Sequence, residues 1–420
     1  MNPVTPVSNS SSSNFPVART DAPTRTDALT RTVAETFTRL AHAAAAAGLE
    51  TPCYLMDHAA FHRNGLILKH VQEETGAKIL LAQKAFACFN LYPTLRNYLA
   101  GTTASGLHEA RLGAEEFGGE VHVFSPAYTP KEMTQLLEIS DHIVFNSLSQ
   151  WTRYREEVLA AERPVSPGLR INPEYAESVA EIYNPCAAGS RFGVLAQDMN
   201  EDDLIGIEGL HFHTLCEQGS DALERTLTHV IAKFDSHLQR MKWLNFGGGH
   251  LITSENYDVP RLIRVIREVQ ARYPHLQIYL EPGEAISTGT GVLVGSVIDL
   301  LKNGIDIAVL DVSATAHMPD VLEMPYRPDV ENGGEFEEKA YSYRLGAPTC
   351  LSGDLIGDYS FDKPLQIGDQ IVFQDMAHYT MVKNTTFNGV RLPSIAILQE
   401  DGQIEMVREF DYADYKMRLG

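Results

Sequence analysis

Residues 80–85 read Leu-Leu-Ala-Gln-Lys-Ala, an apolar run of strand length that ends on a charged side chain, Lys84. It is one of a series of short apolar runs, and helix-like stretches such as residues 59–74 and 222–238 separate most of them. The runs lie near residues 78–83, 102–105, 121–125, 142–147, 168–172, 207–214, 242–247 and 277–281. Eight strands alternating with helices over about 230 residues predict an α/β fold, a closed (β/α)8 TIM-like barrel.

Three parts with different patterns follow one another along the chain. Residues 1–35 are rich in Ser, Thr, Pro and Asn and have few apolar residues to bury, which predicts a disordered tail. The alternating pattern predicts the barrel over residues 57–288. Runs such as residues 291–298 predict a C-terminal β-rich domain over residues 289–420, and the short strand 52–56 is expected to join that domain.

Charge and cysteine content restrict the class of function. A formal net charge of −21 argues against nucleic-acid binding, which needs clustered Lys and Arg, and permits attraction of a cationic small molecule. No apolar run approaches the ~20 residues that span a bilayer, so no membrane association is expected. The five cysteines are widely spread without a Cys-x-x-Cys pair, which predicts free thiols in the cytoplasm and no structural zinc site.

Several of the predicted strands end in polar residues. Barrel enzymes place their catalytic residues at these C-terminal strand ends. Lys84 ends the first strand, His211 and His213 the sixth and Glu281 the eighth, while residues 247–249 form a Gly-Gly-Gly loop after the seventh. A lysine in the barrel mouth would be desolvated, which lowers its pKa and makes it a better nucleophile. Alone, Lys84 would more often be a surface residue, but the other three features favour a catalytic role.

Each of these other residues also has a simpler explanation. The glycine loop could be only a tight turn, although barrel phosphate sites favour the loops after strands seven and eight. Glu281 could bridge to a neighbouring base, or it could pair with a protonated pyridine nitrogen of a cofactor. His211 and His213 face the same side of a strand, as in the His-x-His pair of metal-dependent barrel hydrolases. The further ligands are not evident, so no metal site is predicted, and His213 is interpreted as a ring stacked on a cofactor.

Together these residues resemble the fold-type III pyridoxal-phosphate decarboxylases, the family of ornithine, arginine and diaminopimelate decarboxylases. The resemblance implies pyridoxal 5'-phosphate as cofactor, with Lys84 carrying it and His213 stacking on its ring. Glu281 would pair with the pyridine nitrogen. The cofactor phosphate would lie against the loop residues and one tyrosine: Gly247, Gly248, Gly249, Gly283 and Tyr379.

A further motif implies a homodimer with shared active sites. Residues 346–350 read Gly-Ala-Pro-Thr-Cys, and Ser-Gly-Asp follows at 352–354, which resembles the cysteine loop of the family. There the cysteine reaches the partner subunit's site and donates a proton, so Cys350 is predicted to be catalytic. Asp354 would contact the distal amine of the substrate. An ordinary buried thiol remains the alternative for Cys350.

The differences from the family pattern indicate a branch. Most relatives have Arg after Glu-Pro-Gly, whereas this chain has Glu284, so how the second charge of the phosphate is balanced stays open. Residues 183–193, 210–217 and 316–328 resemble the carboxynorspermidine/carboxyspermidine decarboxylases of polyamine and spermidine biosynthesis. The substrate would then be a small-molecule polyamine, and its binding residues would be Glu284, Asp320, Asp354, Glu217 and Arg191.

Two alternatives remain at this point. The chain could be a diaminopimelate, ornithine or arginine decarboxylase. It could also be a non-catalytic relative that regulates a partner decarboxylase, although the presence of both Lys84 and Cys350 counts against this.

Overall fold

The computed structural model describes residues 32–177 and 184–420, and eight parallel strands form a closed barrel in it. The first strand pairs with both the second and the eighth, which closes the ring. All eight predicted runs contain strands, including the threonine-containing second run, so the barrel prediction is confirmed. The barrel strands are β2 (Lys78–Ala82), β3 (Gly101–Ala104), β4 (Glu120–Phe124), β5 (His142–Phe145), β6 (Ser166–Asn172), β8 (Gly209–His211), β9 (Trp243–Asn245) and β10 (Gln277–Leu280).

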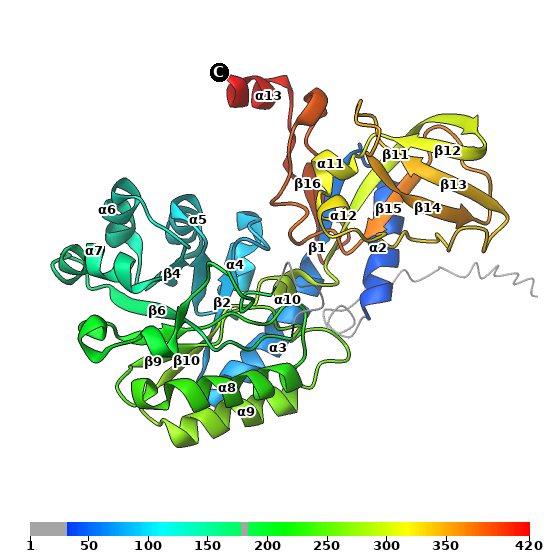
Figure 1. The fold of residues 1–420 in the computed structure, drawn as a ribbon. Coiled ribbons are helices and arrows are strands. Elements are labelled where there is room, and N and C mark those ends of the chain that lie inside the picture. Colours follow the sequence, from blue (N-terminus) through cyan, green and yellow to red (C-terminus); the bar gives the residue numbers. More distant parts are fainter. Residues whose placement is uncertain (1–31, 178–183) are drawn as a thin grey trace, which may run out of the picture.

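Helices surround these strands, and local signals set their ends. Asp57 caps the first of them by accepting from the backbone N–H of Ala59, and Gly76 ends that helix in the left-handed conformation. Thr129 and Glu132 form a capping box at the start of another. The helices are α3 (His58–Thr75), α4 (Tyr92–Leu95), α5 (Leu107–Leu112), α6 (Pro130–Ile139), α7 (Leu148–Leu159), α8 (Ser220–Leu238), α9 (Val259–Arg272) and α10 (Glu284–Ser287). Figure 1 shows α6, α7, α8 and α9 on the outside of the barrel.

Side chains fill the barrel interior, where the large ring of Trp243 leaves space only for glycine at two nearby positions. Trp243 on β9 lies in the interior with Leu80, Val144 and Tyr279. A Cβ atom added to Gly168 on β6 or to Gly209 on β8 would lie 2.2 Å or 1.9 Å from its indole ring, so both of these strands carry glycine there. The lower barrel is therefore a packed core, and only the rim at the C-terminal strand ends can hold a ligand.

A second, mixed sheet is built mostly from the C-terminal part of the chain. Its strand β1 (Cys53–Asp57) comes from the N-terminal side of the barrel and lies between β11 and β16. Figure 1 shows this sheet beside the barrel. Its other strands are β11 (Gly291–Asn303), β12 (Ile305–Leu310), β13 (Tyr341–Gly346), β14 (Leu355–Phe361), β15 (Gln370–Gln374), β16 (Ser394–Leu398) and β17 (Ile404–Arg408).

An N-terminal helix that was not predicted from the sequence precedes β1. Helix α2 (Val33–Ala47) starts directly after Thr32, whose side chain forms a capping box with Glu35. Residues 33–35, assigned to the tail, are therefore helical. The rest of the predicted tail, residues 1–31, lies outside the described residues, as does residue 183 of the motif quoted above. Across the described ranges, every helix is too short or too polar to cross a membrane.

Candidate active site

Lys84 and His213 meet at the rim of the barrel. Lys84 follows β2 and His213 follows β8, and Lys84 Nζ lies 3.5 Å from His213 Nε2. The backbone N–H of Gly248 donates to His213 Nδ1 at 3.0 Å. Because an N–H group can only donate, Nδ1 is unprotonated, and a neutral ring then has its proton on Nε2. The Nε2–H group faces Lys84. The lysine nitrogen therefore accepts a hydrogen bond from it, which only a neutral amine can do.

Burial and charge favour the same neutral forms. Desolvation first, and the charge of Arg170 second, lower the pKa of Lys84, although solvent can still reach the side chain through the barrel mouth. Desolvation and the charges of Lys84 and Arg170 lower the pKa of His213 well below its ordinary value. The neutral amine is the form of lysine that attacks a carbonyl carbon. The site therefore prepares Lys84 for covalent bonding to an aldehyde.

The glycine loop after β9 approaches other backbone segments too closely for any side chain. Gly247 and Gly249 have φ values of +70° and +84°. A Cβ atom on Gly248 would lie 2.4 Å from the carbonyl oxygen of Glu281, and one on Gly249 would lie 2.0 Å from that of Leu215. A loop without side chains lets backbone N–H groups surround a phosphate.

Glu281 follows β10 and is a buried carboxylate with a contact at each of its two oxygens. His211 Nε2 lies 3.0 Å from Glu281 Oε2, and the amide of Asn245 donates to Oε1 at 2.8 Å. Burial alone would raise the pKa of Glu281, but the interactions with His211 and Asn245 outweigh it and lower the pKa. Each carboxylate oxygen keeps a lone pair, so Glu281 can still accept a hydrogen bond from a protonated pyridine nitrogen. His211 is therefore the partner of this carboxylate.

Arg170 is a site residue that the sequence analysis missed. It lies on β6, is buried, and donates through Nη2 to the carbonyl oxygen of His213 at 3.1 Å. Its guanidinium lies between two rings, 4.5 Å from the centroid of Phe124 and 4.3 Å from that of Phe192. Burial lowers its pKa to about 10, and the charge of Glu281 opposes that shift. Arg170 thus keeps a positive charge between Glu281 and Lys84.

Two further loops close around the turn that bears Lys84. The Glu-Pro-Gly loop contacts it through Gly283, where an added Cβ would lie 2.5 Å from Ala85 Cβ. The backbone N–H of Tyr379 donates to the carbonyl oxygen of Ala85 at 2.8 Å. Tyr379 has a φ of +42°, and burial together with the charge of Glu284 raises the pKa of its phenol. Residues 283 and 379 therefore both contact Ala85, next to Lys84.

Carboxylates gather next to these loops, and we call Glu217, Glu284, Asp320 and Asp375 the acidic group. Burial raises the pKa of Glu284 to about 7; His378 opposes the shift and the other three carboxylates add to it. Asp375 was not predicted from the sequence. The mutual influence shows that the four carboxylates share one region, beside Gly283 and Tyr379.

Two cations balance part of the acidic group. His378 Nε2 lies 3.5 Å from Asp375 Oδ1, and this contact overcomes the effect of burial and raises the pKa of His378 to about 9. Lys383 Nζ lies 2.5 Å from Asp320 Oδ1 and also pairs with Glu323. The carboxylates still outnumber the cations, so the region attracts positively charged groups.

Three predicted residues make no hydrogen bond or ion pair with Lys84, His213 or Glu281 among the described residues, although Arg191 shares the ring of Phe192 with Arg170. Cys350 is exposed on the loop between β13 and β14, where its backbone N–H donates to Asn388 Oδ1 at 2.8 Å. Asp354 is buried and accepts from Ser313 and Thr349, so in this chain it holds the cysteine loop. Arg191 is exposed, with its guanidinium 4.2 Å from the ring of Phe192. Roles for these three residues stay predictions.

The site fits pyridoxal phosphate. Gly283 is a buried residue whose backbone N–H makes no hydrogen bond in the described part of the chain, and a phosphate oxygen would supply an acceptor. The loop of residues 247–249 adds a side-chain-free surface beside it. A neutral lysine amine suits the aldehyde, and an ionised Glu281 suits a protonated pyridine nitrogen. A barrel with these groups on its rim defines a class of enzyme that carries pyridoxal phosphate on a lysine.

Comparison with known proteins agrees with this class. The profile described as "Pyridoxal-dependent decarboxylase, C-terminal sheet domain" matches residues 53–377. The chain is 48% identical to a carboxyaminopropylagmatine decarboxylase of Synechocystis sp. over 89% of this chain and 96% of that one. It is 44% identical to a carboxynorspermidine/carboxyspermidine decarboxylase of Campylobacter jejuni over 88% and 98%. The crystal structure of carboxynorspermidine decarboxylase from Campylobacter jejuni, complexed with norspermidine, has a TM-score of 0.82 and 42% identity, covering 88% of this chain and all of that one.

The chain belongs to the pyridoxal-dependent decarboxylases. Its cofactor is pyridoxal phosphate, and it is a carboxy-lyase. The high identity to relatives that are named decarboxylases supports the catalytic interpretation over a non-catalytic relative, and family membership removes the metal-hydrolase interpretation.

Gly248→Ala tests the glycine loop. The added methyl group would overlap the carbonyl oxygen of Glu281, so we expect a loss of about 1–3 kcal/mol in the free energy of unfolding. We also expect weaker retention of the cofactor on dialysis. Urea unfolding and the bound cofactor per chain measure the two effects. Gly106→Ala is the matched control, because its Cβ would meet no atom within 4 Å. Equal stability of the two variants would contradict the prediction.

Proposed function

We propose that this enzyme decarboxylates carboxynorspermidine or carboxyspermidine and releases norspermidine or spermidine, a step of polyamine biosynthesis. The observation that carries the proposal is the acidic group beside the loops around Lys84. Such a substrate has several ammonium groups along one chain, and each needs a carboxylate when it leaves water. Glu284 stands where most relatives have Arg, so charge at this position favours a cation over an anion. The names of the relatives support the same substrate class.

The residues of the chain have separate tasks in the proposed reaction. Bound pyridoxal phosphate supplies the electron sink that takes up the electron pair of the bond to the departing carboxylate. Lys84 provides the neutral amine that attaches the cofactor, and His213 holds that amine and covers the ring. Glu281 stays ionised and holds a proton at the pyridine nitrogen. The carbon that loses CO2 takes one proton in exchange, and we assign this proton to the thiol of the partner subunit's Cys350.

We also propose that the enzyme is a homodimer with shared sites and acts in the cytoplasm. Two observations support the shared sites. Cys350 is exposed, and it is not among the groups that influence the pKa of Lys84 in its own chain. A thiol that donates a proton in the active site would then come from the partner subunit. All five cysteines lie in the described ranges and are free thiols, which supports a reducing compartment.

Release of CO2 from a panel of purified substrates tests the proposed activity. The panel contains carboxynorspermidine, carboxyspermidine, diaminopimelate, ornithine and arginine. The proposal expects kcat/KM for the first two to exceed that for the three amino acids by about 100-fold or more, because only they engage several carboxylates at once. Comparable values for diaminopimelate or ornithine would refute it.

One observation favours a second candidate substrate. The Synechocystis relative, at 48% identity, is named for carboxyaminopropylagmatine, which ends in a guanidinium group instead of an ammonium group. Both ends are cations, so the acidic group suits either. Adding carboxyaminopropylagmatine to the same panel separates the two candidates by their kcat/KM values.

The acidic group predicts a particular pH dependence. Because the pKa of Glu284 is raised to about 7, this carboxyl gains its charge as the pH rises through 7 and loses it as the pH falls. His378, with a pKa of about 9, stays positive over this range. We expect kcat/KM for the cationic substrate to fall roughly tenfold from pH 8 to pH 6, since one favourable ion pair is lost.

Glu284→Gln should remove this step from the pH profile of kcat/KM and lower its value at pH 8. Glu116→Gln, an exposed carboxyl on the outside of the barrel, serves as the matched control and should keep the step. An unchanged profile in Glu284→Gln would assign the titration to another group.

A further inference from the structure

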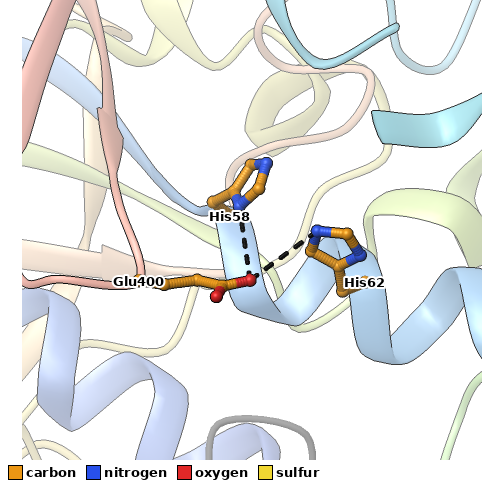
Figure 2. A group of neighbouring side chains, drawn as sticks. All are labelled: His58, His62 and Glu400. Atoms are coloured by element: carbon orange, nitrogen blue, oxygen red, sulfur yellow. Dashed lines mark ion pairs between the residues drawn. The ribbon is translucent and has the colours of Figure 1, made fainter. Parts of the chain in front are cut away.

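Two histidines and a glutamate that are not among the active-site residues described above meet where the barrel adjoins the mixed sheet. His58 and His62 lie one turn apart on α3, and Glu400 lies in the turn between β16 and β17. Figure 2 shows both rings directed toward one carboxylate oxygen. His58 Nδ1 lies 3.9 Å and His62 Nε2 3.7 Å from Glu400 Oε1. From this geometry we propose that the three residues bind a zinc ion.

The fold itself brings these residues together. Strands β1 and β16 are parallel neighbours, and Asp57 pairs in register with Leu398. The chain therefore leaves both strands at the same edge, with His58 next after Asp57 and Glu400 two residues beyond Leu398. Arg39 donates to the carbonyl oxygen of Gln399 at 3.0 Å and also pairs with Asp57, which fixes the turn relative to the helix start.

The distances from the two histidine nitrogens to Glu400 Oε1 suit a shared tetrahedral metal ion better than a direct hydrogen bond. Nitrogen and oxygen atoms at 3.7 and 3.9 Å are too far apart for a hydrogen bond. Ligands about 2.0–2.2 Å from zinc are roughly 3.3–3.6 Å apart, so small side-chain shifts complete the site. His58 Nδ1 is buried and has no hydrogen-bond partner among the described residues. A metal ion would satisfy this atom and bridge it to the carboxylate.

The opposite ring nitrogens are held as in known metal sites. His58 Nε2 lies 2.8 Å from the hydroxyl of Thr94, and His62 Nδ1 lies 2.5 Å from the hydroxyl of Tyr98. Such outer hydrogen bonds fix the ring orientation of metal-binding histidines. Two imidazoles and one carboxylate suit zinc, and they leave one position for water.

Another His and Glu group does not share these features. Glu120, His122 and His142 lie inside the lower barrel, where Glu120 already pairs with the ammonium group of Lys78 and with His122. A zinc ion there would compete with a bound cation. At the proposed site no lysine or arginine pairs with Glu400 among the described residues. A bound zinc ion would fasten the first turn of α3 to the β16–β17 turn.

Zinc titration of the chelator-treated holoenzyme tests the proposal. We expect one zinc ion per chain and a rise in the melting temperature on zinc addition. Glu400→Gln and His62→Gln should each weaken binding by about 100-fold or more, and Tyr98→Phe by about 10- to 100-fold. His70→Gln, an exposed histidine on the same helix, is the matched control and should bind as the wild type does.

Anomalous diffraction at the zinc edge then locates the ion. A peak between His58, His62 and Glu400 supports the proposal. A peak at Cys350 or at the barrel rim overturns it, as does equal zinc binding by wild type and Glu400→Gln. The cofactor absorbance at each step shows that the holoenzyme is intact, so loss of zinc binding is not mistaken for loss of the fold.

Discussion

Replacing Lys84 by alanine is expected to abolish covalent attachment of pyridoxal phosphate and to lower kcat/KM by roughly four orders of magnitude or more. The reason is chemical as well as steric. The tautomer of His213, fixed by the N–H of Gly248, makes Lys84 a neutral amine in this contact. No other lysine occurs in the turn after β2, so the variant has no substitute nucleophile there.

Borohydride reduction followed by peptide mass spectrometry measures this attachment, because it fixes the cofactor to the residue that carries it. Lys78→Ala is the matched control: Lys78 lies at the opposite end of the same strand and pairs with Glu120. That variant should keep both the label on Lys84 and its turnover. Label on another lysine in Lys84→Ala, with activity retained, would refute the assignment.

Much of the fold was predictable because each barrel strand carries its own local signal. Even the polar run Gly101–Ala104 is a strand, since its threonines are β-branched and buried. A Cβ on Gly101 would lie 2.0 Å from the carbonyl oxygen of Glu120, so the glycine there reflects strand pairing. Helix α2 was not predicted, although Thr32 and Glu35 form a capping box at its start.

The part of the site that sequence could not predict depends on closure of the barrel. In the sequence, Arg170 is a charged residue within an apolar strand run and has no evident partner. Its partner, the carbonyl oxygen of His213, comes within reach only because β6 pairs with β8. Asn245 can donate to Glu281 only because β9 lies beside β10, and Glu281 follows the end of β10. His211 could be a metal ligand on spacing alone, and the structure shows it beside Glu281. Such pairings join residues far apart in the chain.

The cysteine loop shows a different limit of sequence reasoning. Its motif predicted that Cys350 donates a proton and that Asp354 contacts the distal amine of the substrate. In the structure the two residues have opposite environments, because Asp354 is buried and anchors the loop through Ser313 and Thr349, while Cys350 is exposed. An anchored loop with an exposed thiol is suited to reach a surface outside its own chain.

Cys350→Ala is expected to keep the cofactor and lose about 10²- to 10⁴-fold in kcat, because the carbon that loses CO2 then lacks its proton donor. Bound cofactor per chain and the rate of CO2 release measure the two properties separately. Ser352→Ala, in the same loop, is the matched control and should keep its turnover. Loss of cofactor from Cys350→Ala would instead indicate a structural role.

Mixing the two inactive variants tests whether the sites are shared between subunits. In a twofold dimer of Lys84→Ala with Cys350→Ala, one site receives both intact residues and the other receives neither. Random exchange makes half of the dimers mixed, so activity should recover to about one quarter of the wild-type value. Each variant exchanged with itself should stay inactive. If Cys350 acted within its own chain, every site would lack one of the two groups, and the mixture would stay inactive as well.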